Sequence, residues 1–428
     1  MHHVLILGGG FVGLNAAKVL AGRKNVRVTI VDRSNYHLFQ PLLYQVASAG
    51  LSPSDIATPI RSLFSANENI KTYKAEITGI DPDSRQVDTD IGTFGYDYLI
   101  MGLGAKHFYF GNEHWEEYAP GLKTIEQATE IRRRILESFE RAEAATDTEE
   151  KMKHLSFVVV GGGSTGVELA GALGELSRFV FVRDFRNIDP KLTRIILIEA
   201  GERILPAFSR ELSARATRDL ESLGVQVWTS RKVTGLDSEG VNIGEERIKA
   251  GTVLWAAGIT ASRLNRQLSG NLDGMGRIVV EPDCSLRDHP EVFAAGDQAH
   301  FTDERHGTLP ANAPVALQQG KHIASNILRE IEGKQREPYQ YFDKGQLATI
   351  GRKQAVLERG RVKLGGFLAW WAWLFVHIYY LLGFKNKLFV LAHWAYSYFT
   401  YRKGARLIVN KEWRFYKRSR TEEANRSE

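Results

Sequence analysis

The first thirty residues contain two short hydrophobic runs separated by glycines and by a helical pattern. The runs are Val4 to Leu7 and Val26 to Val31, each of a length typical of a strand. Between them, residues 14–22 read LNAAKVLAG, which favours a helix. A strand, a glycine turn, a helix and a second strand in this order predict a βαβ unit with a parallel sheet.

The same pattern recurs about 150 residues later, with hydrophobic runs at 157–160 and 195–198 around a second glycine turn. The repeat predicts an α/β fold with two Rossmann-like dinucleotide-binding domains, the second inserted in the first. We expect residues 1–120 and 270–341 to form the first domain and residues 121–269 to form the second.

Two further segments lie between the repeats. Residues 131–145 combine charged and apolar positions and predict an amphipathic helix. Residues 146–154, TDTEEKMKH, are polar and predict a linker into the second repeat.

The last part of the chain has a different pattern, and we expect residues 342–428 to form a separate C-terminal module. Residues 364–384 contain no Asp, Glu, Lys or Arg, and residues 367–401 hold 14 of the chain's 44 aromatic residues. The first of these segments is long enough to suggest a membrane-spanning helix. Lys and Arg flank it on both sides, however, so the charges show none of the asymmetry of a spanning topology.

Trp and Tyr are typical of the membrane–water interface, where an apolar ring meets a wet polar tip. We therefore expect a membrane-associating module that lies among the lipid headgroups as a monotopic anchor. The alternative is a soluble homodimer, because aromatic residues also dominate such interfaces.

Composition and charge narrow the class of protein. Among 428 residues, 43% are hydrophobic and 25% are charged, which excludes a disordered chain, a collagen-like chain and one made mostly of membrane spans. The net charge of +6 arises in residues 352–420, where 15 Lys and Arg residues stand against two Glu. We expect this end to be attracted to an anionic lipid surface, and we expect no nucleic-acid partner. No signal-peptide pattern precedes the first strand, so we expect the protein to stay in the compartment where it is made.

Gly8, Gly10 and Gly13 form the pattern Gly-x-Gly-x-x-Gly directly after the first predicted strand. The first glycine permits the tight turn, the second lets backbone approach a pyrophosphate, and the third lets the helix pack on the strand. Asp32 ends the second strand, 19 residues beyond Gly13, close to the spacing of a carboxylate that accepts hydrogen bonds from ribose hydroxyls. These residues predict a dinucleotide site.

Gly161, Gly163 and Gly166 repeat the pattern directly after the strand predicted at 157–160. The corresponding acid is Glu199, which ends a strand 33 residues further on, across a longer connection than usual. A carboxylate there repels a 2′-phosphate and favours NADH over NADPH. Two dinucleotide sites in one chain imply electron transfer between two dinucleotides, one of which should be a tightly held flavin.

Several further segments resemble type II NADH:quinone oxidoreductases, members of the flavoprotein superfamily with two dinucleotide-binding domains. The resemblance runs from residue 4 to about residue 410 and rests on YHLFQPLLYQ (36–45), RDFRNIDP (183–190), LWAAG (254–258), VFAAGD (292–297) and the aromatic, basic C-terminus. It implies non-covalent FAD in the first domain, with Asp297 at the ribityl chain. It also implies NADH in the second domain, with Gly258 in its site.

The resemblance implies an activity as well. NADH would be oxidised and two electrons would pass through FAD to a membrane quinone, on a peripheral enzyme at the cytoplasmic face of the cell membrane. No spanning bundle and no intramembrane chain of carboxylates is visible in the sequence, so we expect no proton pumping.

One segment departs from the pattern of that family. The family commonly has Ala-Gln-x-Ala-x-Gln on its quinone side, whereas residues 313–318 read APVALQ, with Pro314 in place of the first glutamine. Gln318 is therefore the residue that we carry over to the quinone side. Proline suits the first turn of a helix. A helix beginning near Pro314 would aim N–H groups, including those of Val315 and Ala316, at the flavin and stabilise negative charge there.

Glu168 follows Gly166 by two residues, in the first turn of the second predicted helix. In the family, the acid at this place lies by the nicotinamide and quinone side of the flavin and is a candidate for substrate positioning or proton delivery. Acids are favoured at helix N-termini for structural reasons alone, so both interpretations stay open. The same holds for His37 and Tyr44, which either face the flavin or pack.

Cys284 is the only cysteine, which excludes a redox-active disulfide and the enzymes of this architecture that depend on a cysteine pair. It lies too late in the chain for the cysteine of NADH peroxidases and oxidases, so we interpret it as structural. Two alternatives remain: a soluble ferredoxin or rubredoxin reductase, and a flavin-binding, NADH-responsive signalling protein resembling apoptosis-inducing factor. The chain has no spaced set of His or Cys residues, so we expect no metal site.

Overall fold

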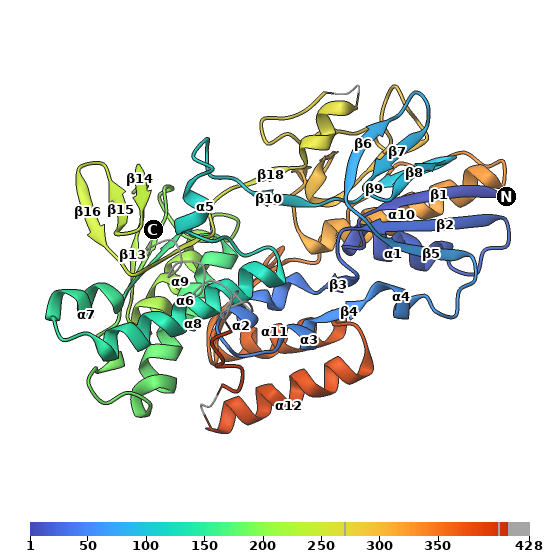
Figure 1. Ribbon diagram of the computed structural model, residues 1–428. Helices are drawn as coiled ribbons and strands as arrows, with labels where there is room; N and C mark the ends of the chain where they lie inside the picture. The colour runs from blue at the N-terminus through green and yellow to red at the C-terminus, as the bar shows by residue number, and fades with distance from the viewer. Residues whose placement is uncertain (269–270, 401–402, 410–428) are drawn as a thin grey trace, which may run out of the picture.

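The computed structural model describes residues 1–268, 271–400 and 403–409, and it has two main lobes (Figure 1). The first lobe is built on a parallel sheet with the strand order β20-β9-β1-β2-β5. Its strands are β1 (His2–Leu7), β2 (Val26–Asp32), β5 (Ile70–Lys74), β9 (Tyr98–Met101) and β20 (Val292–Ala294). Val4 to Leu7 are fully buried, because neighbours cover both faces of a parallel sheet.

The second lobe contains a parallel sheet with the order β13-β12-β11-β17. Its strands are β11 (Ser156–Val160), β12 (Arg194–Ile198), β13 (Val225–Trp228) and β17 (Thr252–Trp255). Helix α1 (Phe11–Leu20) follows β1, and helix α8 (Ser164–Glu175) follows β11, which confirms both predicted βαβ units. Since β20 returns to the first sheet after β17, the second unit is inserted in the first. The exact boundaries at residues 120, 269 and 341 stay predictions.

Strands β10 (Ala105–His107) and β18 (Ile259–Ala261) run antiparallel between the two lobes (Figure 1). Each lobe also carries a small antiparallel sheet. These sheets are formed by β6 (Ile77–Asp81), β7 (Gln86–Thr89) and β8 (Gly92–Gly95) in the first lobe, and by β14 (Gly235–Asp237), β15 (Gly240–Ile243) and β16 (Glu246–Lys249) in the second.

Helix α6 (Ile125–Ala144) confirms the helix expected at 131–145 but begins six residues earlier. Its start is fixed by Thr124, whose hydroxyl accepts a hydrogen bond from the N–H of Gln127 at 3.2 Å. The side chain of Gln127 in turn accepts from the N–H of Thr124 at 3.3 Å. This reciprocal cap satisfies two N–H groups that the helix itself leaves free.

The linker predicted at 146–154 is wrong, because the structure has helix α7 (Thr148–His154) there. The side chain of Asp147 accepts a hydrogen bond from the N–H of Glu150 at 2.9 Å and caps the first turn. A polar composition therefore did not prevent a short, capped helix.

The C-terminal region begins with an antiparallel sheet that packs on the second lobe. Its strands are β24 (Gln346–Gly351), β25 (Gln354–Arg359) and β26 (Val362–Gly365). A Cβ atom at Gly171 of α8 would lie 1.7 Å from the carbonyl oxygen of Ile350 in β24. Only glycine therefore permits this close approach of helix and strand.

The charge-free segment 364–384 does not form one long helix. Helix α11 (Phe367–Tyr380) ends before a turn that contains Gly383 at a φ of +81°, and helix α12 (Phe384–Thr400) follows. Figure 1 shows the two helices along one edge of the molecule, with α12 outermost. No helix among the described residues is long and apolar enough to cross a membrane. The remainder of the predicted C-terminal module, residues 401–402 and 410–428, lies outside the described residues.

Candidate functional site

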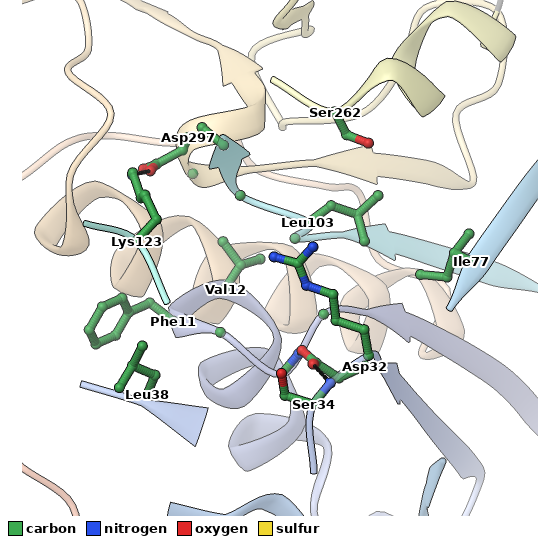
Figure 2. Close-up of a pocket in the computed structure, with 18 of the residues that line it drawn as sticks. Phe11, Val12, Asp32, Ser34, Leu38, Ile77, Leu103, Lys123, Ser262 and Asp297 are labelled. Carbon is green, nitrogen blue, oxygen red and sulfur yellow. Dashed lines mark hydrogen bonds and ion pairs between the residues drawn. The ribbon is translucent and has the colours of Figure 1, made fainter. Parts of the chain in front are cut away.

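The first glycine loop forms one wall of a cavity of about 410 Å³ in the first lobe (Figure 2). Gly8 has a φ of +97°, and a Cβ there would lie 2.4 Å from the carbonyl oxygen of Gly102. A Cβ on Gly13 would lie 1.9 Å from the carbonyl oxygen of Gly8. Gly10 differs, because a Cβ there would meet no atom of the protein within 4 Å. Two glycines thus build the loop, and Gly10 keeps open the space that a pyrophosphate would take.

Asp32 closes the same cavity at the end of β2. Its Oδ2 atom accepts a hydrogen bond from the N–H of Gly9 at 2.6 Å, and its Oδ1 atom accepts from the N–H of Ser34 at 2.6 Å. Burial raises the pKa of Asp32, and the two N–H donors partly oppose this rise. The carboxylate is therefore held rigidly beside the loop, as its predicted role requires.

Asp297 lies toward the other end of the cavity, as Figure 2 shows. Its Oδ2 atom lies 3.0 Å from Nζ of Lys123, and both residues also line a second cavity of about 170 Å³. A cavity with a glycine loop, a carboxylate near each end and a cation fits a bound dinucleotide. The sequence had indicated Asp297 but not Lys123, which precedes α6 and carries no motif.

Helix α10 (Ala313–Ile331) starts where the sequence predicted, with Pro314 in its first turn. The side chain of Asn312 accepts a hydrogen bond from the N–H of Val315 at 3.0 Å, and the side chain of Val315 is buried. The N–H of Val315 is thus already paired with the helix cap. Ala316 lines both cavities with its small side chain, so the two residues expected together at the flavin have different surroundings.

The structure does not bring Gln318 to Glu168. The Gln318 side chain donates to the carbonyl oxygen of Phe342 at 3.1 Å and accepts from the N–H of Phe342 at 3.0 Å. It lines a different cavity, between α1, α10 and the start of α12. Its amide is therefore engaged in fixing the chain that enters the C-terminal region.

The second glycine loop repeats the geometry of the first. A Cβ on Gly161 would lie 2.6 Å from the carbonyl carbon of Ala256, and one on Gly166 would lie 1.8 Å from the carbonyl oxygen of Gly161. Gly163 again has no protein atom within 4 Å of a Cβ. Gly258, at a φ of +71°, lies beneath the ring of Phe110, whose Cζ atom would be 2.9 Å from a Cβ.

Glu199 holds the second loop as Asp32 holds the first. Its Oε2 atom accepts from the N–H of Gly162 at 2.6 Å, and its Oε1 atom accepts from the N–H of Gly201 at 2.6 Å. The longer connection before Glu199 therefore does not displace it. The carboxylate accepts hydrogen bonds beside its glycine loop in the same way as Asp32 does beside the first loop.

Glu168 lies in the second turn of α8 and not in the first turn, where the sequence predicted it, because the helix already begins at Ser164. It lies at the meeting point of two cavities. One is the cavity of about 170 Å³ next to Asp297, and the other, of about 120 Å³, lies between α8, β24, α11 and α12. Burial raises the pKa of Glu168 to about 8, although the backbone N–H of Thr349 donates to the carboxylate. The side chain is therefore mostly protonated at neutral pH.

Tyr44 lines the same two cavities and is fixed from the C-terminal region. Its hydroxyl accepts a hydrogen bond from Nε2 of Gln45 at 2.9 Å, and Oε1 of Gln45 accepts from Nε1 of Trp394 at 2.7 Å. Burial raises the pKa of Tyr44 well above its usual value. The sequence left Tyr44 undecided because this network joins residues about 350 positions apart.

Neither His37 nor Cys284 lines the cavities beside Asp32, Asp297 and Glu168, although His37 lines the cavity that Gln318 also lines. His37 is buried, and its Nδ1 atom lies 2.9 Å from the carbonyl oxygen of Gly9, so it supports the first loop from behind. Cys284 is fully buried without a disulfide partner, and burial raises the pKa of its thiol well above the usual range. An inert thiol is what the structural interpretation of Cys284 requires. Among the described residues, no three His, Cys, Asp or Glu side chains are grouped to hold a metal ion.

Comparison with known proteins extends these observations. Residues 2–320 match the pyridine nucleotide-disulphide oxidoreductase family, and residues 344–403 match the NDH2 C-terminal domain. The chain is 40% identical over 427 residues to the type II NADH:quinone oxidoreductase Ndh of Mycobacterium tuberculosis, covering 96% of this chain and 91% of the relative. It is 31% identical over 365 residues to that of Staphylococcus haemolyticus, covering 82% and 88%.

A solved structure shares the fold over nearly the whole chain. NDH2 from Plasmodium falciparum, in complex with NADH, superposes with a TM-score of 0.86 at 21% identity, covering 96% of this chain and 100% of that chain. The sulfide:quinone oxidoreductase of Aquifex aeolicus superposes with a TM-score of 0.71. Both glycine loops, the NDH2-type C-terminal region and relatives of nearly equal length lead to one conclusion. The chain belongs to the family of type II NADH:quinone oxidoreductases, whose characteristic flavin is FAD.

Proposed function

We propose that this protein transfers two electrons from NADH through FAD to a membrane quinone, without moving protons across the membrane. The observation that carries this proposal is the position of Glu168 and Tyr44, which line both central cavities. One cavity leads to Asp297 and the dinucleotide side, and the other leads beneath the apolar helices α11 and α12. A quinone that enters between those helices would therefore come close to the flavin side.

The first lobe would hold FAD. Gly10 leaves room for the pyrophosphate, Asp32 would accept from ribose hydroxyls, and Asp297 with Lys123 faces the second cavity. FAD, when bound, supplies the two-electron chemistry that connects NADH with quinone. The N-terminus of α10 would place positive potential at this cavity and stabilise negative charge that develops there, whereas the Lys123 ammonium is paired with the Asp297 carboxylate.

The cavity beneath α11 and α12 would take the quinone. Trp370, Trp373 and Trp394 line it and suit a flat ring, and the charged side chains of Glu175 and Arg352 also line it. Glu168 stands at its inner end, protonated at neutral pH, and would give a proton to a quinone oxygen. Gln318 would not contact the quinone in this scheme. Its amide instead positions the backbone of Phe342, where the chain enters the C-terminal region.

We expect the purified, flavin-loaded protein in detergent to oxidise NADH rapidly with a soluble quinone, and NADPH at least tenfold more slowly. The reason is that the Glu199 carboxylate would accept from ribose hydroxyls but repel a 2′-phosphate. Absorbance of the nicotinamide during steady-state turnover measures both rates. A flavin that NADH bleaches but no quinone re-oxidises would contradict the proposal and favour a protein acceptor.

The variant Glu199→Gln tests whether the Glu199 carboxylate sets the preference for NADH over NADPH. It keeps one acceptor oxygen and removes the charge, so the ratio of kcat/KM for NADH over NADPH should fall roughly tenfold, the effect of about 1.4 kcal/mol. Asp32→Asn, the corresponding change in the first loop, should leave this ratio unchanged in protein that retains flavin. A lower ratio in both variants would show that Glu199 does not set the preference.

We further propose that the protein is peripheral to the membrane, on the cytoplasmic face, with α11 and α12 in the headgroup region. The support is a surface of large side chains that are more than one-third exposed on these two helices: Phe367, Leu368, Trp371, Phe375, Val376, Tyr379, Phe384, Leu388, Phe389, Leu391, Tyr396 and Phe399. A soluble protein rarely leaves so large an apolar surface uncovered. Lys353, Lys385 and Lys387 surround it and would be attracted to anionic lipid.

The double variant Phe375→Asp/Phe399→Asp should lose most co-sedimentation with anionic lipid vesicles. Phe375 is 68% exposed and Phe399 is 80% exposed, so neither change disturbs the interior, but each places a charge where the bilayer would lie. The control Ile91→Asp changes a residue that is 54% exposed on the β7–β8 turn and should bind like the wild type. Full vesicle binding combined with conversion of a dimer to a monomer would instead identify the aromatic surface as a homodimer interface.

A further inference from the structure

A cavity of about 460 Å³ lies apart from the route between NADH and quinone. It is enclosed by α1, α10, the chain before β24 and the turn between α11 and α12. Helices α1 and α10 both line the cavity, and they pack closely on each other, because a Cβ on Gly320 would lie 2.3 Å from the carbonyl oxygen of Val12. Phe11 is the wall between this cavity and those of the first lobe.

Four lysines from four separate segments converge on this cavity. Lys18 comes from α1, Lys321 from α10, Lys344 from the chain before β24, and Lys387 from α12. No Asp or Glu is among the described residues that line it. The lysines repel each other, and desolvation followed by the Lys321 ammonium lowers the pKa of Lys18. A cluster of like charges without an acid favours an anionic occupant.

The polar groups near two of these lysines are neutral acceptors. The Nζ atom of Lys344 donates to the hydroxyl of Tyr380 at 2.7 Å, and that of Lys387 donates to the backbone carbonyl of Tyr379 at 3.0 Å. Each ammonium has three N–H donors, so each keeps donors for a ligand. The two hydrogen bonds therefore orient the ammonium groups without neutralising them.

The rim of the cavity is apolar and continues into the surface proposed to face the membrane. Leu381 and Leu382 form the turn at the rim, and Phe384 and Tyr379 beside them are 82% and 74% exposed. Leu388, one turn further along α12, is 57% exposed. An occupant with an anionic head and long apolar chains matches both parts, whereas a small free anion uses only the lysines.

We propose that this cavity binds the phosphodiester headgroup of an acidic phospholipid, with Lys18, Lys321, Lys344 and Lys387 around the phosphate and the acyl chains along Phe384 and Leu388. This inference rests on the proposed placement of α11 and α12 at the membrane. It adds a defined, saturable lipid site to the diffuse attraction between a basic surface and anionic lipid. Binding there would fix the α11–α12 turn against α1 and α10.

The test is calorimetric titration of the flavin-loaded protein in neutral detergent with dioctanoyl phosphatidylglycerol, dioctanoyl phosphatidylcholine and inorganic phosphate. We expect phosphatidylglycerol to saturate one site, with much weaker binding of the other two. Lys18→Gln/Lys321→Gln should weaken phosphatidylglycerol binding roughly thirtyfold, from the attraction expected for two lysines. Inorganic phosphate that binds as tightly as phosphatidylglycerol and displaces it would overturn the lipid assignment.

The matched control is Lys353→Gln/Lys385→Gln. It removes the same charge from the same region, but these lysines lie over the rings of Tyr398 and Phe389 and do not line the cavity. Binding should stay within about threefold of wild type, since only diffuse attraction is lost. Equal weakening in both double variants would show that no defined site exists.

Two further measurements keep the outcome interpretable. Lys18→Arg/Lys321→Arg should retain phosphatidylglycerol binding, because arginine also binds phosphate. Loss of binding in this charge-preserving variant, with an unchanged flavin spectrum and Tm, would contradict a charge-based site. NADH:quinone turnover of the wild type in the same lipid-free detergent tests the proposed function separately. An active enzyme that binds no phosphatidylglycerol would contradict only the lipid site.

Discussion

Gly10→Ala is expected to give a folded protein that has lost most of its flavin. Gly10 has a φ of −72°, which alanine adopts freely, and a Cβ there meets no protein atom within 4 Å. The added methyl group would instead occupy the space for the pyrophosphate. Such overpacking costs about 1–3 kcal/mol, or roughly 10- to 100-fold in affinity for FAD. The ratio of flavin to protein absorbance, measured after gel filtration, gives the result.

Gly163→Ala in the second loop is the reciprocal control. Gly163 also has a φ of −72° and an open Cβ position, so this variant should keep its flavin and show a KM for NADH raised roughly 10- to 100-fold. Gly13→Ala should behave differently from both, because its Cβ would lie 1.9 Å from a carbonyl oxygen and destabilise the fold itself. If Gly10→Ala retained flavin and Gly163→Ala lost it, the assignment of the two dinucleotides to the two lobes would be reversed.

Glu168→Gln should lower the rate of quinone reduction on the order of a hundredfold, the lower end of the effect of a general acid. Glutamine keeps the size of the side chain, but its amide has no acidic proton to transfer. Bleaching of the flavin by NADH in a single turnover without quinone should change far less. Stopped-flow absorbance separates the two half-reactions, and equal loss in both would assign Glu168 to NADH binding instead.

The pH profile provides an independent check on Glu168. Its carboxyl group is protonated below its pKa of about 8 and loses the proton above it. Quinone reduction by the wild type should therefore fall as pH rises through about 8, and Glu168→Gln should lack this decline. The same pKa lies above the usual range for glutamate, so burial of Glu168 makes folding less favourable as pH rises from about 4.3 to 8. Gln at this position should remove that dependence in thermal unfolding experiments.

The dinucleotide loops could be predicted from the sequence because their chemistry is local. Gly8 and Gly161 need positive φ values, Gly13 and Gly166 need close helix packing, and these demands fall at fixed spacings. Asp32 and Glu199 end strands next to their loops, so their hydrogen bonds follow from the βαβ topology. The unusually long sequence separation between Gly166 and Glu199 did not displace Glu199, because the register of β12 against β11 determines its position.

The rest of the site depends on contacts between distant segments. Lys123 forms an ion pair with Asp297, which lies 174 residues away in the sequence. No sequence motif near Lys123 indicates this contact. Gln318 was assigned from a motif, but the face that α10 turns to the cavities is set by its packing on α1 at Gly320. That contact turns Ala316 to the cavities and Gln318 to Phe342. Hydropathy likewise marked residues 364–384 as one segment, whereas only Phe367–Tyr380 of it forms a helix, and the turn at Gly383 separates that helix from α12.

The C-terminal region touches both lobes, and this arrangement has a mechanical consequence. Strand β24 is seated against Gly171 of the second lobe, while Leu382, in the turn before α12, packs against the core of the first lobe. The segment that we propose to rest on the lipid would therefore also connect the two lobes. A bilayer that immobilises α11 and α12 would restrain the rotation of one lobe against the other about β10 and β18. Release from the membrane would then loosen the alignment of the two dinucleotides. It would do so through the orientation of the lobes, without altering the residues that contact the dinucleotides.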